Sequence, residues 1–197
     1  WYPVASIDRC RVSGKRGCPK VTDEGCEKMP TFRAEQLGTV ATLVMQGAGV
    51  SEQEASVVAR ELQGANLVGH DSHGVMRLMQ YVDYIEKKVI CPGQEMEILK
   101  EGDAFLLIDG HFNFGQVVAS EALKLGKEKA RQAGTATIFI RNCNHVGRLG
   151  SYTQQAALEK FAAMMVVNGP ASGGVAPYGA IQGRMGTNPI TIAAPWG

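Results

Sequence analysis

Several patterns are missing from this sequence of 197 residues, and each absence excludes a class of protein. No run of roughly 18 apolar residues is present, and the N-terminus lacks the apolar block of a secretory signal, so we expect a soluble protein. The 20 Lys and Arg nearly balance the 19 Asp and Glu, and this net charge of +1 argues against a nucleic-acid or polybasic membrane partner. Neither a G-x-G-x-x-G fingerprint after a strand nor a P-loop occurs, so a nucleotide would have to bind without these motifs.

Cysteine is scarce and does not form a recognisable pattern. The five cysteines occupy positions 10, 18, 26, 91 and 143, an odd number without a C-x-x-C pair. Such a set does not fit a disulfide scaffold and favours a reducing compartment, so we expect a cytoplasmic protein. The eight-residue spacing of Cys10, Cys18 and Cys26 matches no zinc motif, and no metal site is predicted.

Glycine, in contrast, is in excess. It accounts for 24 of the 197 residues, whereas about 7% is usual. A late cluster stands out, at positions 169, 173, 174, 179, 183 and 186. Because glycine allows tight turns and a close approach of backbone to ligand, this cluster predicts a site built from loops.

The pattern along the chain divides it into three parts. Residues 1–30 have no apolar periodicity and are expected to be a flexible leader, although their basic residues also fit the remnant of an organelle-targeting segment. Residues 31–100 read as a helical N-terminal subdomain, and residues 101–197 as part of an α/β domain. The chain begins with Trp1 and stops at Gly197 within an apolar run, so we expect both ends to be cut.

Three helices are expected in the helical part. The first starts after Thr31 as N-cap, with a stripe of Phe32, Leu37, Val40, Leu43 and Val44, and ends at Gly47 to Gly49. The second starts with a capping box, Ser51 to Glu54, and buries Ala55, Val58, Ala59, Leu62 and Ala65. The third follows Gly74 and ends before Pro92.

Strands and helices alternate in the rest of the chain. Residues 95–100 and 104–108 predict a hairpin, followed by a helix that Gly134 closes and by a buried strand at 135–140. A polar loop at 141–147, a helix at 151–159, a strand at 162–167, a Gly- and Pro-rich loop at 169–186 and a last strand at 190–194 complete the order. This order indicates an α/β layer.

The junction between the second and third helices contains the first candidate site. His70-Asp71-Ser72-His73-Gly74 precedes Arg77 and Tyr81, which share one face of the predicted third helix, with His73 at its N-terminus. A helix N-terminus beside a guanidinium suits a carboxylate ligand. The spacing alone fits a capped helix with solvated Arg and Tyr somewhat better. A divalent metal held by His70, His73, Asp71 and a distant His145 is a further interpretation, but the spacing is not diagnostic.

His145 is the second candidate. It follows a predicted buried strand, in a loop position where α/β sheets bind ligands, and an imidazole there is suited to general acid or base chemistry. A histidine that only hydrogen-bonds the turn fits the same pattern equally well. Cys143 could be a nucleophile, but side chains two residues apart on an extended loop diverge, which disfavours pairing with His145.

Taken together, the motifs resemble those of the type 2 malate/L-lactate dehydrogenase family, whose relatives include ureidoglycolate, sulfolactate and diketogulonate oxidoreductases. The motifs are Ser72-His73-Gly74-Val75-x-Arg77 with Tyr81 behind it, Asn144-His145-x-Gly147, and Gly186-Thr187-Asn188-Pro189 leading to Ala193-x-Pro195. The resemblance runs from about residue 31 to 197 and stops short of the family's full length.

The resemblance implies an NAD(P)-dependent oxidoreductase that exchanges a hydride with a small 2-hydroxy or 2-oxo acid and forms a homodimer. It implies a helical N-terminal subdomain and a mixed-sheet, three-layer NAD(P)-binding domain that is not Rossmann and is incomplete at the C-terminus. His145 matches the acid/base residue, with His73 as its rival and Ser72 beside them. Arg77, Tyr81, Thr187 and Asn188 match substrate-binding positions, and Asn168, Gly169 and Pro170 match cofactor-binding positions.

Two other classes of function stay open. The first is a catalytically inert fragment that serves as a dimerisation or interaction module. The second is a metal- or cysteine-dependent hydrolase that uses His145. The sequence chooses neither between NAD and NADP nor among the hydroxy acids.

Overall fold

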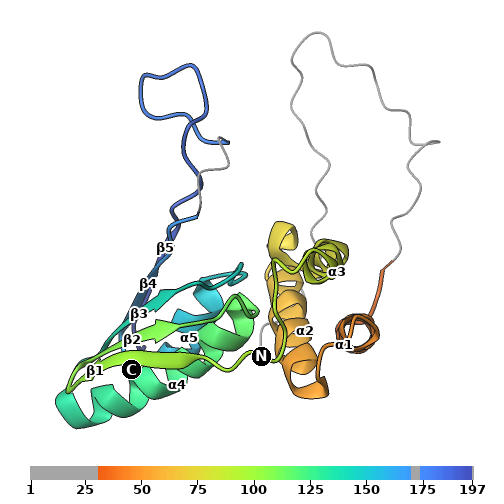
Figure 1. The fold of residues 1–197 in the computed structure, drawn as a ribbon. Helices are drawn as coiled ribbons and strands as arrows, with labels where there is room; N and C mark the ends of the chain where they lie inside the picture. Colours follow the sequence, from red (N-terminus) through yellow and green to blue (C-terminus); the bar gives the residue numbers. More distant parts are fainter. Residues whose placement is uncertain (1–30, 170–173, 197) are drawn as a thin grey trace. The chain divides into compact units, whose positions relative to one another are not determined.

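The computed structural model describes residues 31–169 and 174–196. The expectations for the leader, for Cys10, Cys18 and Cys26, and for Pro170 therefore lie outside the described residues. Residues 32–197 group into one compact unit, in which helices precede a mixed α/β part, as predicted (Figure 1). The boundary between the two parts near residue 100 stays a prediction.

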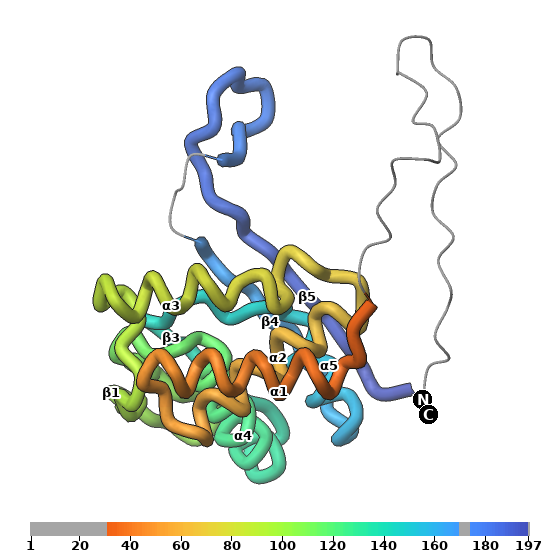
Figure 2. Tube along the Cα trace, turned by 90° about the vertical axis from the view of Figure 1, so that its right-hand side faces the viewer, coloured from red at the N-terminus to blue at the C-terminus, as the bar shows by residue number. Residues whose placement is uncertain are grey.

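The helical part consists of three helices and two 3-10 turns. Helices α1 (Ala34–Gly47) and α2 (Glu52–Leu67) pack against each other, and α3 (Leu78–Glu86) contacts α1 (Figure 2). The predicted cap of α2 is confirmed, because the Oγ of Ser51 accepts a hydrogen bond from the N–H of Glu54 at 3.3 Å. Every predicted core position of α2 is buried: Ala55, Val58, Ala59, Leu62 and Ala65.

The prediction for α1 is wrong in two respects. The helix starts at Ala34 with Arg33 as its N-cap, and not after Thr31. Its buried residues are Ala41 and Met45, which lie in the core that α1 shares with α2 and α3. Three members of the predicted stripe are instead exposed: Phe32, Val40 and Leu43.

The third helix also begins later than predicted. Two 3-10 turns, η2 (Asp71–His73) and η3 (Val75–Arg77), precede α3, so His73 lies before the helix instead of at its N-terminus. Asn66 accounts for this, because its Oδ1 accepts a hydrogen bond from the N–H of Val75 at 2.9 Å and holds the chain beside α2. Arg77 becomes the N-cap residue of α3.

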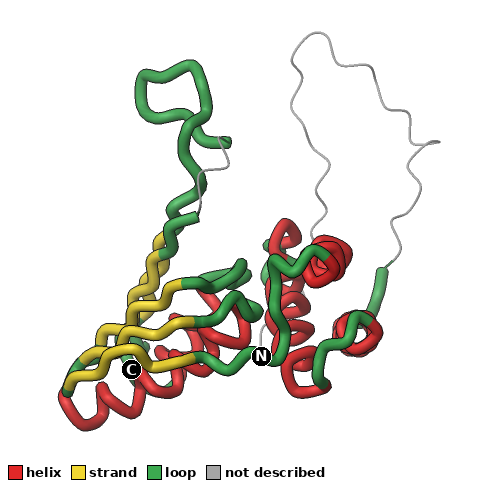
Figure 3. Tube along the Cα trace, in the orientation of Figure 1, coloured by secondary structure: helices red, strands yellow, loops and turns green. Residues whose placement is uncertain are grey.

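A three-stranded mixed sheet lies in the α/β part. Strands β1 (Glu97–Gly102) and β2 (Phe105–Asp109) form the predicted antiparallel hairpin, and β3 (Thr137–Arg141) pairs with β2 in parallel. Helix α4 (Gly115–Ala133) connects β2 to β3 and packs on one face of this sheet (Figure 3). The helix ends as predicted at Gly134, whose φ of 77° is left-handed.

Strand β3 is packed on one face only, whereas its apolar sequence predicts a fully buried strand. Ile138 and Ile140 pack toward α4, whereas Phe139 between them is 56% exposed. Successive side chains of a strand point to opposite faces, and only one face of β3 carries a helix among the described residues.

A second, two-stranded sheet follows α5 (Gly150–Leu158). Strands β4 (Ala163–Val166) and β5 (Ile190–Ala193) are antiparallel, and hydrogen bonds from the N–H of Val167 and of Gly169 continue the pairing beyond them. Both strands contact α5. The other face carries an exposed apolar row: Met164, Val166, Ile190 and Ile192.

No helix in the described ranges has both the length and the apolar character required to cross a bilayer.

Candidate functional site

Histidines from two distant segments meet in the structure. The rings of His70 and His73 follow α2 and lie with centroids 4.4 Å apart. His145 follows β3, and its ring centroid lies 5.0 Å from that of His73. The two predicted candidate sites are therefore one cluster.

Tyr81 and Gln116 connect this cluster to the buried core. The Oη of Tyr81 lies 2.8 Å from Nδ1 of His145, and Nε2 of Gln116 donates a hydrogen bond to the same Oη at 2.7 Å. Tyr81 is 1% exposed and Gln116 is fully buried. Sequence reasoning missed Gln116, because a lone glutamine in the first turn of a helix has the pattern of a surface residue.

Arg77 lies half-buried beside the histidines. Its Nε donates to the carbonyl oxygen of Ser72 at 2.6 Å, and its Nη1 donates to Oε1 of Gln80 at 2.7 Å. Within the described contacts, Nη2 has no partner. The Oγ of Ser72 lies 3.0 Å from Nδ1 of His73. The guanidinium is thus oriented by two bonds and keeps donors for an anionic ligand.

The surroundings favour the neutral form of both central histidines. Desolvation, followed by the charges of His73 and Arg77, lowers the pKa of His145 from 6.5 to about 4. The pKa of His73 is lowered by desolvation and by the charges of His70 and Arg77. The residue His145 is exposed, although Nδ1 of its ring contacts Tyr81.

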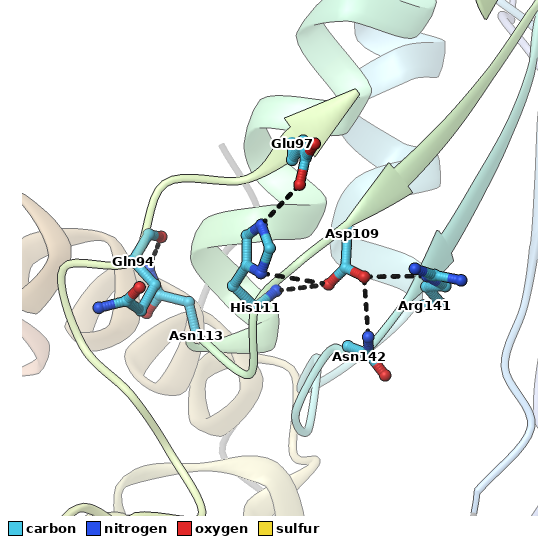
Figure 4. Close-up of polar contacts among 7 residues, drawn as sticks. All are labelled: Gln94, Glu97, Asp109, His111, Asn113, Arg141 and Asn142. Atoms are coloured by element: carbon cyan, nitrogen blue, oxygen red, sulfur yellow. Dashed lines mark hydrogen bonds and ion pairs between the residues drawn. The ribbon is translucent and has the colours of Figure 1, made fainter. Parts of the chain in front are cut away.

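The loop that carries His145 starts at the carboxyl end of β3, next to the loop that follows the parallel strand β2. There Asp109 accepts hydrogen bonds from the N–H of His111 at 3.0 Å, Nε of Arg141 at 2.9 Å and Nδ2 of Asn142 at 2.8 Å (Figure 4). These bonds, with that of the His111 N–H as the largest contribution, lower the pKa of Asp109. The carboxylate therefore joins the loop after β2 to the loop after β3.

Polar contacts on both sides hold the backbone at His145. The Nδ2 of Asn144 donates to the carbonyl oxygens of Val89 at 2.9 Å and Phe112 at 2.6 Å. The Oη of Tyr152 donates to the carbonyl oxygen of Val146 at 2.5 Å. The motif Asn-His-x-Gly thus contains one residue whose side chain anchors the loop and one, Gly147, whose φ of 76° provides the turn.

Gly115 leaves room for this loop at the start of α4. A Cβ at Gly115 would lie 2.2 Å from the carbonyl oxygen of Asn144 and 2.5 Å from that of His145. We expect Gly115→Ala to lower the free energy of unfolding by about 1–3 kcal/mol, the usual cost of overpacking, because both close atoms belong to backbone.

The matched control is Gly64→Ala, also within a helix, where no atom lies within 4 Å of the added Cβ. We expect this variant to be neutral or stabilising. Urea unfolding of both variants measures the difference, and equal midpoints would contradict the close packing at Gly115.

The remaining predicted residues form a second group around β4 and β5. Asn168 and Gly169 lie opposite Thr187, since the N–H of Gly169 donates to the carbonyl oxygen of Thr187 at 3.2 Å. Asn168, Thr187 and Asn188 are exposed. In the described part of the chain, no hydrogen bond joins this group to the histidine cluster, so the residues of each group lie together but the two groups are not connected.

The hydrolase alternatives find little support in the geometry. Burial raises the pKa of Cys143 to about 12, so its thiol stays protonated and is a poor nucleophile. Across residues 31–169 and 174–196, no three His, Cys, Asp or Glu side chains are placed to hold a metal ion.

Known proteins are similar to this chain in sequence and in fold. The family model described as malate/L-lactate dehydrogenase matches residues 32–197. The chain is 39% identical over 173 residues to malate dehydrogenase from Pyrococcus abyssi, covering 88% of this chain and 46% of that protein. It is 38% identical over 164 residues to hydroxycarboxylate dehydrogenase B from Escherichia coli O157:H7, covering 83% and 45%.

The fold agrees with this result. Sulfolactate dehydrogenase from Methanocaldococcus jannaschii superposes with a TM-score of 0.78 at 33% identity, covering 82% of this chain and 46% of the other. The chain spans about half the length of the curated relatives it matches. From its motifs, its fold and the match over residues 32–197, the chain belongs to the malate/L-lactate dehydrogenase family.

Proposed function

We propose that the protein transfers a hydride between a nicotinamide cofactor and a small 2-hydroxy acid, giving the 2-oxo acid. The observation that carries this proposal is the neutral imidazole of His145, bonded to Tyr81 and close to the guanidinium of Arg77. An acid/base group and a fixed cation are what a hydroxy acid requires at its two polar ends. Relatives named malate, hydroxycarboxylate and sulfolactate dehydrogenases support the substrate class.

In the proposed oxidation, each polar group of the chain has one task. Arg77 holds the substrate carboxylate, and Ser72 and Tyr81 line the same pocket. As the C2–H bonding pair leaves as hydride, His145 takes the hydroxyl proton on Nε2 and the C2–O bond becomes a carbonyl. His73 is the rival for this proton, but only His145 is bonded to the buried Tyr81.

The group around β4 and β5 fits a nicotinamide dinucleotide by its chemistry. Asn168, Thr187 and Asn188 expose amide and hydroxyl groups, and the backbone at Gly169 carries no side chain. The sequence from residue 168 to 197 contains no acidic residue and one Arg, which suits an anionic cofactor. When bound, NAD or NADP supplies the hydride acceptor, and these residues would hold it.

Substrate binding is expected to prepare His145 for its task. The charge of Arg77 contributes to the lowered pKa of both His145 and His73. A carboxylate paired with Arg77 neutralises that charge, so the pKa of His145 rises when the acid binds. The acid substrate itself would thereby stabilise the protonated product form of the histidine.

The pH profile of oxidation follows from these shifts. His145 must be neutral to accept a proton, so kcat/KM falls as the pH drops through the pKa of the free protein. Desolvation and the charges of His73 and Arg77 lower that pKa from 6.5 to about 4. We expect the acid limb below pH 6.5, and a limb at or above 6.5 would contradict the neutral site.

Initial rates test the proposed function. With NADH or NADPH and a panel of 2-oxo acids, we expect loss of reduced-nicotinamide absorbance that depends on both reactants.

The alternative, an inert interaction module, is favoured by one observation, the exposed apolar row Met164, Val166, Ile190 and Ile192. It predicts association without turnover, so turnover by the purified protein would exclude an inert module.

We also propose that the protein acts as a homodimer in the cytoplasm. The exposed apolar residues and the lack of a charge excess support association with a like chain. Light scattering during chromatography tests the oligomeric state, and a monomer at working concentration would contradict it.

A further inference from the structure

We infer that Gln116, acting through Tyr81, places the proton of the neutral His145 ring on Nε2, where it faces the oxygen of a 2-oxo acid and must move to Nδ1 before a 2-hydroxy acid is oxidised. This inference rests on the proposed function, because it assumes that His145 faces the substrate oxygen. Gln116 is fully buried, and its Nε2 donates to Oη of Tyr81 at 2.7 Å, whereas its Oε1 has no hydrogen-bond partner among the described residues. The same Oη lies 2.8 Å from Nδ1 of His145.

The hydroxyl proton of Tyr81 has one acceptor. Oη already receives a hydrogen bond from Gln116, so its own proton must point elsewhere. Tyr81 is 1% exposed, and in the described structure Nδ1 of His145 is the remaining polar atom bonded to Oη. A buried hydroxyl without an acceptor is costly, so Tyr81 donates to Nδ1.

The proton of the neutral imidazole then lies on Nε2. A nitrogen that accepts a hydrogen bond carries no proton, and a neutral imidazole has only one. Burial and the nearby cation Arg77 disfavour the doubly protonated form, in agreement with the lowered pKa of His145. Among the described contacts no side chain bonds Nε2, which leaves its N–H for a ligand.

This tautomer distinguishes the two substrates. A ketone oxygen only accepts hydrogen bonds, so it pairs directly with Nε2–H of His145. The hydroxyl of a 2-hydroxy acid can also accept from Nε2–H, but oxidation requires it to give its proton to a lone pair on Nε2, and that requires the proton on Nδ1. Tyr81 would then lose its acceptor, so Gln116 disfavours the tautomer that starts oxidation.

Gln116→Glu reverses this relay with little change in size. An ionised carboxylate can only accept, so Tyr81 then donates to residue 116 and its Oη receives a hydrogen bond from Nδ1–H of His145. Because burial raises the pKa of a carboxyl at this position, the variant is studied at a pH at which that carboxyl is ionised. The matched control is Gln116→Met, which keeps the length of the side chain and offers neither a donor nor a strong acceptor. It removes the constraint without reversing it.

Nitrogen-15 spectra of histidine-labelled protein read the tautomer directly, above the pKa of His145 and without any ligand. The His145 signals are assigned by their loss in His145→Gln. We expect a protonated Nε2 in the unmodified protein, a protonated Nδ1 in Gln116→Glu, and a mixture in Gln116→Met. A protonated Nδ1 in the unmodified protein, as the opposite amide orientation of Gln116 would give, overturns the inference even if every variant unfolds.

Ligand binding provides the functional readout, with pyruvate and lactate as the probes. We expect the ratio of the lactate to the pyruvate dissociation constant to fall about tenfold in Gln116→Glu. Equal changes in both constants would mean a merely structural role and would contradict the inference. If neither acid binds any variant, the initial rates with the panel of 2-oxo acids decide the proposed function, and the spectra still decide the tautomer.

Discussion

His145→Ala is expected to lower kcat by about 10²–10⁴-fold while the dissociation constant of NADH stays close to that of the unmodified protein. The side chain removed is the proposed proton acceptor, whereas the residues proposed to hold the cofactor lie around β4 and β5. Single-turnover rates and NADH fluorescence measure the two quantities separately.

Two companion variants separate chemistry from folding. His145→Ala leaves the Oη of Tyr81 without its acceptor, at a cost of about 1–3 kcal/mol of stability, whereas His145→Gln restores an acceptor but no titrating group. Cys143→Ala, two residues away, removes a thiol that burial keeps protonated and should retain activity. Near-native turnover in both His145 variants would contradict the assigned role.

Arg77→Ala is expected to raise KM for the acid substrate by about 10–100-fold, with a smaller change in kcat. A charge-assisted hydrogen bond to a carboxylate contributes about 1.5–3 kcal/mol. Loss of the cation also removes one cause of the lowered pKa of His145, so the acid limb of the pH profile should move upward.

Arg131→Ala is the matched control. Arg131 is an exposed residue in the last turn of α4 and forms an ion pair with Glu159. It should leave KM unchanged. Arg77→Lys keeps the charge but not the planar donor pair, so partial recovery of KM is expected. An unchanged KM in Arg77→Ala would remove Arg77 from the carboxylate site.

Local sequence patterns predict the ends of the helices well where the position requires a particular residue type. Ser51 caps α2, and Gly134 ends α4 in the left-handed conformation, because each position requires that chemistry and few residues supply it. All predicted core positions of α2 are buried, because neighbouring elements pack against its apolar face. The stripe of α1 misleads, because the hydrophobicity of Val40 and Leu43 does not tell which face a neighbour covers.

The contacts within the candidate site could not be predicted from local sequence patterns. His73, Arg77 and His145 are recognisable from their motifs, but the bond between Tyr81 and His145 joins residues 64 positions apart. Such a contact depends on how the helical part packs against α4, which no local spacing encodes. Gln116 is missed for the same reason, since only its burial and its bond to Tyr81 distinguish it from a surface glutamine.

The residues proposed to bind the cofactor form a separate group. Asn168, Thr187 and Asn188 are brought together by the pairing beyond β4 and β5, but no described bond ties them to the histidine cluster. The motifs predict that both groups serve one reaction. A reaction-based measurement is therefore the appropriate test of their connection.

Isotope transfer tests the central claim most directly. The purified protein is incubated with a 2-oxo acid and reduced nicotinamide carrying deuterium at the transferable position of C4. Hydride transfer predicts one deuterium on C2 of the 2-hydroxy acid product, formed about 10²–10⁴-fold more slowly when His145 is replaced by alanine. A hydroxy acid formed without deuterium on C2, or no product at all, would contradict the account.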